Sequence, residues 1–146
     1  MTSEGPKVVD LEARGLEYRV RIVIDHPADD LAAFTQLTGL VPGICWTRGQ
    51  ERYVPEGTRL PGRHSLSRWQ YSETFRHSRA FSLGVRKVTD ALMPAAARLQ
   101  EVFATGGSAQ LILDLKGHRN IGDVIDAADL GRLAQLGVSL GIEVFP

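Results

Sequence analysis

The sequence has little of what several classes of protein require. Its only cysteine, Cys45, excludes an internal disulfide, and there is no run of about 18 apolar residues that would span a membrane. The 17 acidic residues balance the 17 basic ones, so no net charge draws the chain toward nucleic acid or an anionic membrane surface. The first residues contain no apolar segment typical of a secretory signal. From the 146 residues we expect one domain in the cytoplasm, with no membrane or nucleic-acid partner.

The motifs of the common enzyme and cofactor classes are also missing. The glycines follow neither the G-x-G-x-x-G nor the G-x-x-x-x-G-K pattern of phosphate-binding loops, and no serine lies in a G-x-S-x-G sequence. One cysteine cannot build a thiolate metal site. Metal-ligand spacing is also lacking among the four histidines, which are His26, His64, His77 and His118. We therefore assign no catalytic residue, no metal and no cofactor.

Three segments alternate apolar and polar residues, which is typical of strands with one buried face. In residues 16–25 the even-numbered positions are apolar and the odd-numbered ones are mostly polar. Residues 109–117 show the same pattern at odd-numbered positions, and residues 138–145 form an apolar row at even-numbered positions. Strands of a parallel sheet covered on both sides would instead show continuous apolar runs. The pattern favours a sheet with one wet face.

Helical spacing is found in three places. A short helix is predicted around residues 31–37, ended by Gly39. The longest apolar pattern covers residues 85–103 but contains Pro94, which predicts a kink or a restart because proline lacks the amide hydrogen. The third helix is predicted after an N-cap at Asp126, with Leu130 and Leu133 facing the core and Gly137 as its stop.

The remaining chain is dense in turn-forming residues. Residues 42–62 contain three prolines and four glycines, which predicts a long irregular connection. Residues 65–75 follow as an exposed or edge strand. Together the pattern predicts an α+β fold, a two-layer sandwich of a mainly antiparallel sheet with helices packed on one face. We expect a flexible N-terminal tail over residues 1–15 and a single α+β domain over residues 16–146.

The face of the sheet turned away from the helices is predicted to be ionic. It would carry Arg19 and Arg21 from the first strand, together with Asp114 and Glu143 from the two later strands. Cross-strand ion pairing explains this set more simply than an acid–base catalytic pair does. The same face would also carry an exposed apolar set suited to a homodimer, formed by Val23, Ile112 and Phe145.

Several short motifs, in this order of elements, resemble a bacterial family known only as a domain of unknown function, family 4279. They are LTGLVP after the first helix, Trp46 followed by Gly49 in WTRGQ, Trp69 preceded by Ser67, and the tail LGRLAQLGVSLGIEVF. The likeness covers roughly Leu16 to Phe145, and residues 50–66 look like a variable insertion. The resemblance implies a small soluble α+β domain and brings no activity, substrate or catalytic residue with it.

The stretch Ile44–Gln70 concentrates the residues best suited to binding. It holds both tryptophans, the only cysteine and five of the 14 arginines. An indole stacks on planar groups or cations, and a guanidinium binds carboxylates or phosphates through parallel hydrogen bonds. The alternative is that each tryptophan fills an end of the core while the arginines solvate a loop. The candidate binding residues are Trp46, Arg48, Arg63, His64, Arg68 and Trp69.

The charge distribution leads to our functional hypothesis. Residues 45–79 carry seven arginines against three glutamates, a formal charge of +4, so the remainder carries −4. We expect a non-enzymatic protein-interaction module, of which an immunity-type binder is one form, that docks an acidic partner through segment 45–79. The alternative is a small-molecule binding or enzymatic domain with a pocket near Cys45, His64 and Trp69. RNA binding is a third reading, which the zero net charge disfavours.

Overall fold

The structure is a computed structural model and describes residues 17–76, 80–116 and 121–145. The predicted N-terminal tail, residues 1–15, lies outside the described residues. In chain order, the elements are β1 (Glu17–His26), α1 (Ala33–Thr38), β2 (Ile44–Trp46), β3 (Glu51–Tyr53), β4 (Arg59–Arg63), β5 (Ser67–Arg76), α2 (Phe81–Leu92), the 3-10 helix η1 (Met93–Ala95), α3 (Ala96–Ala104), β6 (Ser108–Lys116), α4 (Ala127–Leu136) and β7 (Ser139–Phe145).

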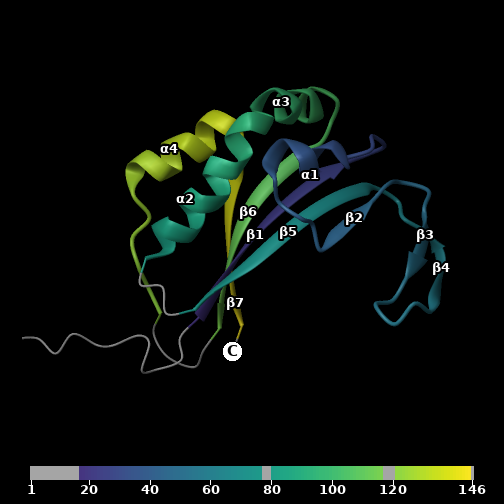
Figure 1. Cartoon of the computed structure of the whole chain (residues 1–146), viewed down its shortest axis with the longest axis horizontal. Helices are drawn as coiled ribbons and strands as arrows, with labels where there is room; N and C mark the ends of the chain where they lie inside the picture. Colours follow the sequence, from purple (N-terminus) through teal and green to yellow (C-terminus); the bar gives the residue numbers. More distant parts are fainter. Residues whose placement is uncertain (1–16, 77–79, 117–120, 146) are drawn as a thin grey trace, which may run out of the picture.

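Five of the strands form one sheet in the order β2-β5-β1-β6-β7, and β3 and β4 form a separate two-stranded hairpin. The central strand β1 pairs antiparallel with both β5 and β6, whereas β7 runs parallel to β6 because α4 carries the chain back between them. All helices lie on one face of the five-stranded sheet (Figure 1). The predicted α+β class, a mainly antiparallel sheet with helices on one face, is confirmed.

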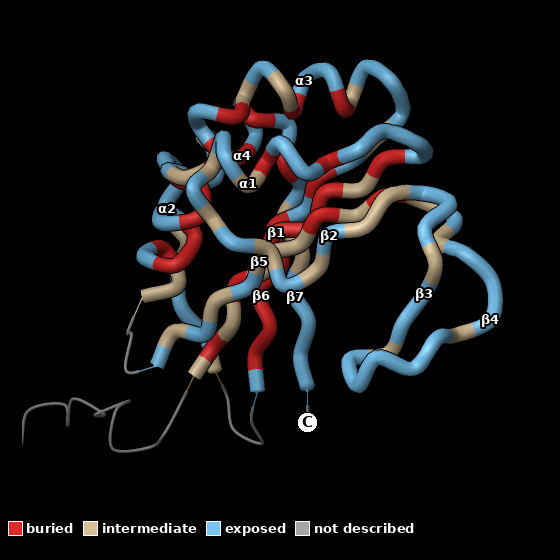
Figure 2. Tube along the Cα trace, turned by 45° about the vertical axis from the view of Figure 1, so that its right-hand side comes forward, coloured by how far each residue is buried: buried red, intermediate tan, exposed pale blue. Residues whose placement is uncertain are grey.

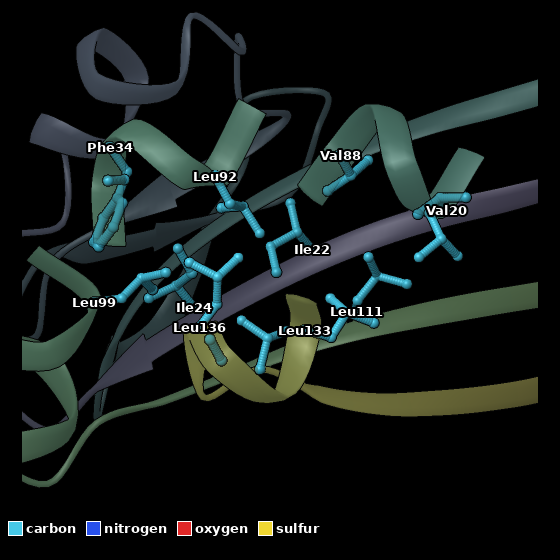
Figure 3. Close-up of a cluster of buried hydrophobic side chains, with 14 of the residues drawn as sticks. Val20, Ile22, Ile24, Phe34, Val88, Leu92, Leu99, Leu111, Leu133 and Leu136 are labelled. Carbon is cyan, nitrogen blue, oxygen red and sulfur yellow. The ribbon is translucent and has the colours of Figure 1, made fainter. Parts of the chain in front are cut away.

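The core lies between the sheet and its helices. The alternation predicted for the first strand is present, since Val20, Ile22 and Ile24 are fully buried on the face toward the helices. They pack with side chains from β6 and all four α-helices (Figure 3). Figure 2 shows the buried positions concentrated between the two layers. None of the helices in the described ranges is long and apolar enough to cross a membrane.

The long helical pattern is interrupted where proline predicts it. Pro94 lies in η1, which separates α2 from α3. At the other end of the pattern, Gly84 lets α2 approach β1 closely. A Cβ atom there would lie 2.8 Å from the Tyr18 hydroxyl and 2.9 Å from a Val20 methyl group. The Tyr18 hydroxyl in turn donates a hydrogen bond of 2.8 Å to the Ala80 carbonyl, which fixes the start of α2.

The connection and strand predicted for residues 42–75 need correction. Residues 42–62 are not an irregular connection, since β2, β3 and most of β4 lie within this range. The strand predicted as an edge, β5, lies second from the edge because β2 pairs with its first half. A strand as short as β2, within a sequence rich in glycine and proline, leaves too few alternating positions to be recognised.

Three details of the C-terminal region also differ from expectation. In α4, Leu133 faces the core as predicted, but Leu130 is exposed and Leu136 takes the inner position. Asp126 occupies the N-cap position, although its side chain makes no capping hydrogen bond. In β7 the apolar row is only partly covered, because the helices reach the first part of this strand alone (Figure 1).

The face away from the helices carries the predicted cross-strand ion pairs. Asp114 accepts hydrogen bonds from the Nε atoms of both Arg19 and Arg21, each at 2.7 Å, and Arg21 also donates to Glu143 at 2.8 Å. Burial raises the pKa of Asp114, but the hydrogen bonds from Arg21 and Arg19 outweigh it and hold the pKa below its ordinary value. The carboxylate therefore stays ionised and joins β6 to β1, while the pair of Arg21 with Glu143 extends the network to β7.

The apolar residues expected on that face do not form an exposed patch. Val23 and Ile112 lie there, yet they are only 9% and 8% exposed. Only Phe145 of the predicted set remains substantially exposed, at the end of β7. The homodimer surface predicted from these three residues is therefore not present on this face.

Candidate functional site

The candidate site lies at the β2 end of the sheet, where the β3–β4 hairpin projects away from the helices (Figures 1 and 2). A cleft of about 370 Å³ opens between the hairpin and the start of β5. We call it the hairpin cleft. Its lining residues are Trp46, Arg52, Arg63, His64, Ser65, Leu66 and Arg68.

The base of the hairpin is fixed by backbone hydrogen bonds. The Gly49 N–H donates to the His64 carbonyl at 2.9 Å, and the His64 N–H donates to the Gln50 carbonyl at 3.0 Å. Gly49 has a φ of 87°, in the left-handed region that a side chain would disfavour. The Gln50 side chain accepts a hydrogen bond from the Thr47 N–H at 2.9 Å and closes the turn. These bonds hold His64 beside β2.

An aromatic stack forms one wall of the cleft. The Trp46 and His64 rings lie face to face, with centroids 3.9 Å apart and an angle of 12° between their planes. Partial burial, together with the nearby charge of Arg52, lowers the pKa of His64 below its ordinary value. The imidazole is therefore neutral at neutral pH, and the stack is a contact between two uncharged rings.

The arginines of the cleft differ in how their charge is compensated. Arg68 on β5 makes a two-pronged ion pair with Asp25 on β1, with distances of 2.7 and 2.9 Å. Arg52 donates to the Pro61 carbonyl at 3.3 Å, and Arg63 donates to the Gly49 carbonyl at 2.8 Å. A carbonyl orients a guanidinium without neutralising it, and Arg52 has no ion pair among the described residues. Arg63 lies 4.0 Å from the Glu51 carboxylate, which also pairs with Arg59 at 3.3 Å. One shared carboxylate does not neutralise these arginines, so positive charge remains at the cleft.

A second cavity, of about 440 Å³, lies beside the hairpin cleft and shares part of its wall. Its lining residues are Cys45, Trp46, Gln50, Glu51, Tyr53 and His64. Burial, together with the charge of Asp30, raises the pKa of the Cys45 thiol. An activated nucleophile would need the opposite shift. The shared cavity therefore brings Cys45 and His64 together without the electrostatics of a cysteine nucleophile.

Four of the six predicted binding residues line the hairpin cleft: Trp46, Arg63, His64 and Arg68. Arg48 is exposed but does not line the cleft, and its backbone N–H donates to the Ser67 hydroxyl at 3.0 Å. Trp69 lies in the core with no exposed surface, and its indole N–H donates to the Thr35 hydroxyl at 3.1 Å. Trp69 therefore fills the core, the alternative that the sequence left open.

Arg52 is not among the predicted binding residues, because the hairpin that carries it lies in the range predicted as an irregular connection. The pairing of β3 with β4 places Arg52 opposite Leu60, and Arg63 opposite Glu51, the residue before Arg52. The signal for a hairpin was present in VPEGT, a turn sequence between two short polar runs. Within the described residues, no group of three or more histidine, cysteine, aspartate or glutamate side chains could hold a metal ion.

Comparisons with known proteins agree with the resemblance in the sequence. Residues 16–144, most of the chain, match the family described as Domain of unknown function (DUF4279). No curated protein and no solved structure matches the chain. The match includes β2, the hairpin and β5, so the hairpin cleft lies within the family domain. By this match the chain belongs to the DUF4279 family.

Proposed function

We propose that the chain is a cytoplasmic, non-enzymatic module that binds an acidic protein partner at the hairpin cleft. The observation that carries this proposal is the position of Arg52 and Arg63 beside the Trp46–His64 stack. Both guanidinium groups donate to backbone carbonyls, and Arg63 has in addition only a 4.0 Å ion pair with Glu51, a carboxylate that it shares with Arg59. A partner carboxylate would supply the missing negative charge through parallel hydrogen bonds. The stack would supply a flat apolar surface beside it.

The charge of the whole region supports the same proposal. Residues 45–76 hold six arginines and three glutamates, a formal charge of +3, on a chain with no net charge. Some of these charges are compensated internally, as in the pair of Arg59 with Glu51 at 3.3 Å. The hairpin itself, residues 51–63, holds three arginines and two glutamates, a formal charge of +1. Such a charged rim speeds association with an acidic surface and makes it sensitive to salt.

The test uses the cleft arginines and a charge-matched control. The double variant Arg52→Ala/Arg63→Ala removes two positive charges from the cleft. The control Arg98→Ala/Arg132→Ala removes two from the helices, on the other side of the molecule. The probes are synthetic peptides in which glutamate or aspartate flanks an aromatic residue, with lysine-flanked versions as the negative set. Because Trp69 is fully buried, the fluorescence of Trp46 reports binding at the cleft.

We expect acidic peptides to bind the wild-type chain and the control variant with similar affinity, and to bind more weakly as salt increases. The cleft variant should lose about tenfold or more in affinity, since a hydrogen-bonded charge contributes about 1.5 to 3 kcal/mol. Equal losses in the two double variants would show that only net charge matters. Absence of binding by every acidic peptide would overturn the proposal in this form.

A second candidate function rests on the cavity beside the cleft. A small molecule could occupy the volume of about 440 Å³ between Cys45 and His64, as the alternative hypothesis expected, although Trp69 takes no part. In that case planar small molecules would raise the melting temperature of the chain, and Cys45→Phe would abolish the effect by filling the cavity. Binding of acidic peptides should survive Cys45→Phe if the protein-binding proposal holds.

A further inference from the structure

The two edges of the five-stranded sheet are protected to different degrees. At one edge, β2 has three residues and the hairpin follows it closely (Figure 1). The second half of β5, which β2 does not reach, contains the charged residues Glu73 and Arg76, which discourage pairing with another strand. At the other edge, β7 has seven residues, Ser139–Phe145, and β6 is its one partner among the described strands. An edge strand of this length presents a row of unpaired backbone N–H and C=O groups, which is a template for another strand.

The side chains of β7 leave this edge open as well. The strand contains no lysine, arginine or proline, the residues that usually protect an edge. Its one charged residue, Glu143, points to the outer face and binds Arg21 at 2.8 Å. On the face toward the helices, Ile142 is 60% exposed and Val144 is 68% exposed. Figure 2 shows the second half of β7 as exposed surface beside the buried β6.

We propose that β7 pairs antiparallel with β7 of a second copy of this chain, around a two-fold axis at Ile142. The pairing would join the two five-stranded sheets into one continuous sheet. It would also bury the apolar side chains that the helices leave uncovered. A C2 dimer of this kind closes on itself, so the exposed edge would be used up and would not extend into a fibre.

In this register the sequence of β7 is complementary to itself, which favours a second copy of the chain as the partner of the β7 edge. A two-fold axis at Ile142, the middle residue of the strand, pairs all seven residues. Leu140 then faces Val144 of the partner subunit, and Ile142 faces its own equivalent, so every pair on the inner face is apolar. On the outer face Glu143 lies opposite Gly141, and the two carboxylates are not opposed. An axis at Glu143 would place them directly opposite each other, which is unfavourable.

The dimer should be weak. Pairing of one edge strand buries less than the roughly 1,600 Å² of a standard stable interface. We therefore expect the average mass measured by sedimentation to rise from one chain toward two between micromolar and millimolar concentration. Ile142→Lys places a charge in the centre of the pairing and should keep the chain monomeric. Leu83→Lys, at a similarly exposed position on α2, should leave the association unchanged.

Disulfide trapping tests the register itself. In a Cys45→Ser background, Ile142→Cys places two thiols at the axis, where the Cα atoms of an antiparallel pair lie about 4.5 to 5.5 Å apart. We expect rapid cross-linking under mild oxidation. Val144→Cys is the matched control, because the two equivalent positions would lie four residues apart along the strand, about 13 Å. That distance is too long for a disulfide, and we expect little cross-linking.

Three outcomes would overturn the proposal. The first is a chain that stays monomeric at millimolar concentration and whose Ile142→Cys variant does not cross-link. The second is equal cross-linking of the Ile142→Cys and Val144→Cys variants, which would exclude this register. The third is slow exchange of the β7 amide hydrogens at every concentration in a monomer, which would mean that the edge is already covered within one chain. All three measurements are independent of the hairpin cleft, which lies at the opposite edge.

Discussion

Replacing Asp114 by asparagine tests the electrostatic account of the outer face. The Asp114 side chain is 0% exposed, and it receives two hydrogen bonds from Arg21 and one from Arg19. Asparagine keeps the shape of the side chain but loses its charge. Its carbonyl oxygen can still accept a hydrogen bond from a guanidinium, but its NH2 group, which replaces the second carboxylate oxygen, cannot. Breaking one partner of a buried ion pair destabilises a protein by about 3 to 5 kcal/mol.

The expected loss lies at the lower end of that range or slightly below it, at about 2 to 3 kcal/mol. The reason is that the arginine side chains, 39% exposed for Arg19 and 15% for Arg21, can recover part of their hydration. For a chain of this size, 1 kcal/mol corresponds to roughly 2 to 4 °C in melting temperature. Urea unfolding followed by circular dichroism gives the free energy directly. The control is Glu143→Gln, half exposed on the same network, which should cost less than about 1 kcal/mol.

The dependence on pH provides a second, independent check. Because the folded pKa of Asp114 lies below its ordinary value, the ionised carboxylate stabilises the fold above that ordinary value. This contribution is lost as the pH falls through the folded pKa. The difference between wild type and Asp114→Asn should therefore be constant near neutral pH and shrink below about pH 4. A difference that is small at neutral pH, or equal to that of Glu143→Gln, would refute the account.

Three further predictions concern packing and the thiol. Gly84→Ala should lower the free energy of unfolding by about 1 to 3 kcal/mol, because the new methyl group meets Tyr18. Gly131→Ala, in helix α4, has open space around the new methyl group and should raise the free energy of unfolding by about 1 kcal/mol. Urea titrations of both variants compare the two effects directly. Trp69→Ala should cost about 3 to 5 kcal/mol in the same assay, and a loss below 1 kcal/mol would mean that the indole does not fill the core. Cys45 should react with iodoacetamide more slowly than an ordinary thiol at neutral pH, because burial raises its pKa, and fast alkylation would contradict that shift.

The sequence predicted those parts of the fold whose pattern is long enough to be distinctive. The ten residues of β1 and the nine of β6 alternate so regularly that their inner and outer faces could be assigned, including the ionic network on the outside. Pro94 likewise marked the break between α2 and α3. The short strand β2 could not be recognised, and the position of β5 was therefore misjudged. Three residues do not reveal a period of two.

The candidate site was predicted only in part, for a different reason. Residue type suggested Trp46 and Trp69 equally, but they lie on opposite faces of the sheet, one at the surface and the other among the helices. Which face is which depends on the register of β5, and that register depends on the neighbouring strands. The contribution of Arg52 required the β3–β4 pairing as well. Tertiary contacts, rather than local patterns, decide which of these side chains meet.

Because the hairpin is separate from the main sheet, its sequence can change without changing the rest of the fold. Among the described residues, β3 and β4 pair with each other and not with the five-stranded sheet. Insertions, deletions and substitutions in residues 51–63 would therefore leave the strand pairing of the five-stranded sheet untouched. If the hairpin cleft binds a partner as proposed, a change of hairpin would alter what the domain binds while the five-stranded sheet and its helices stay the same.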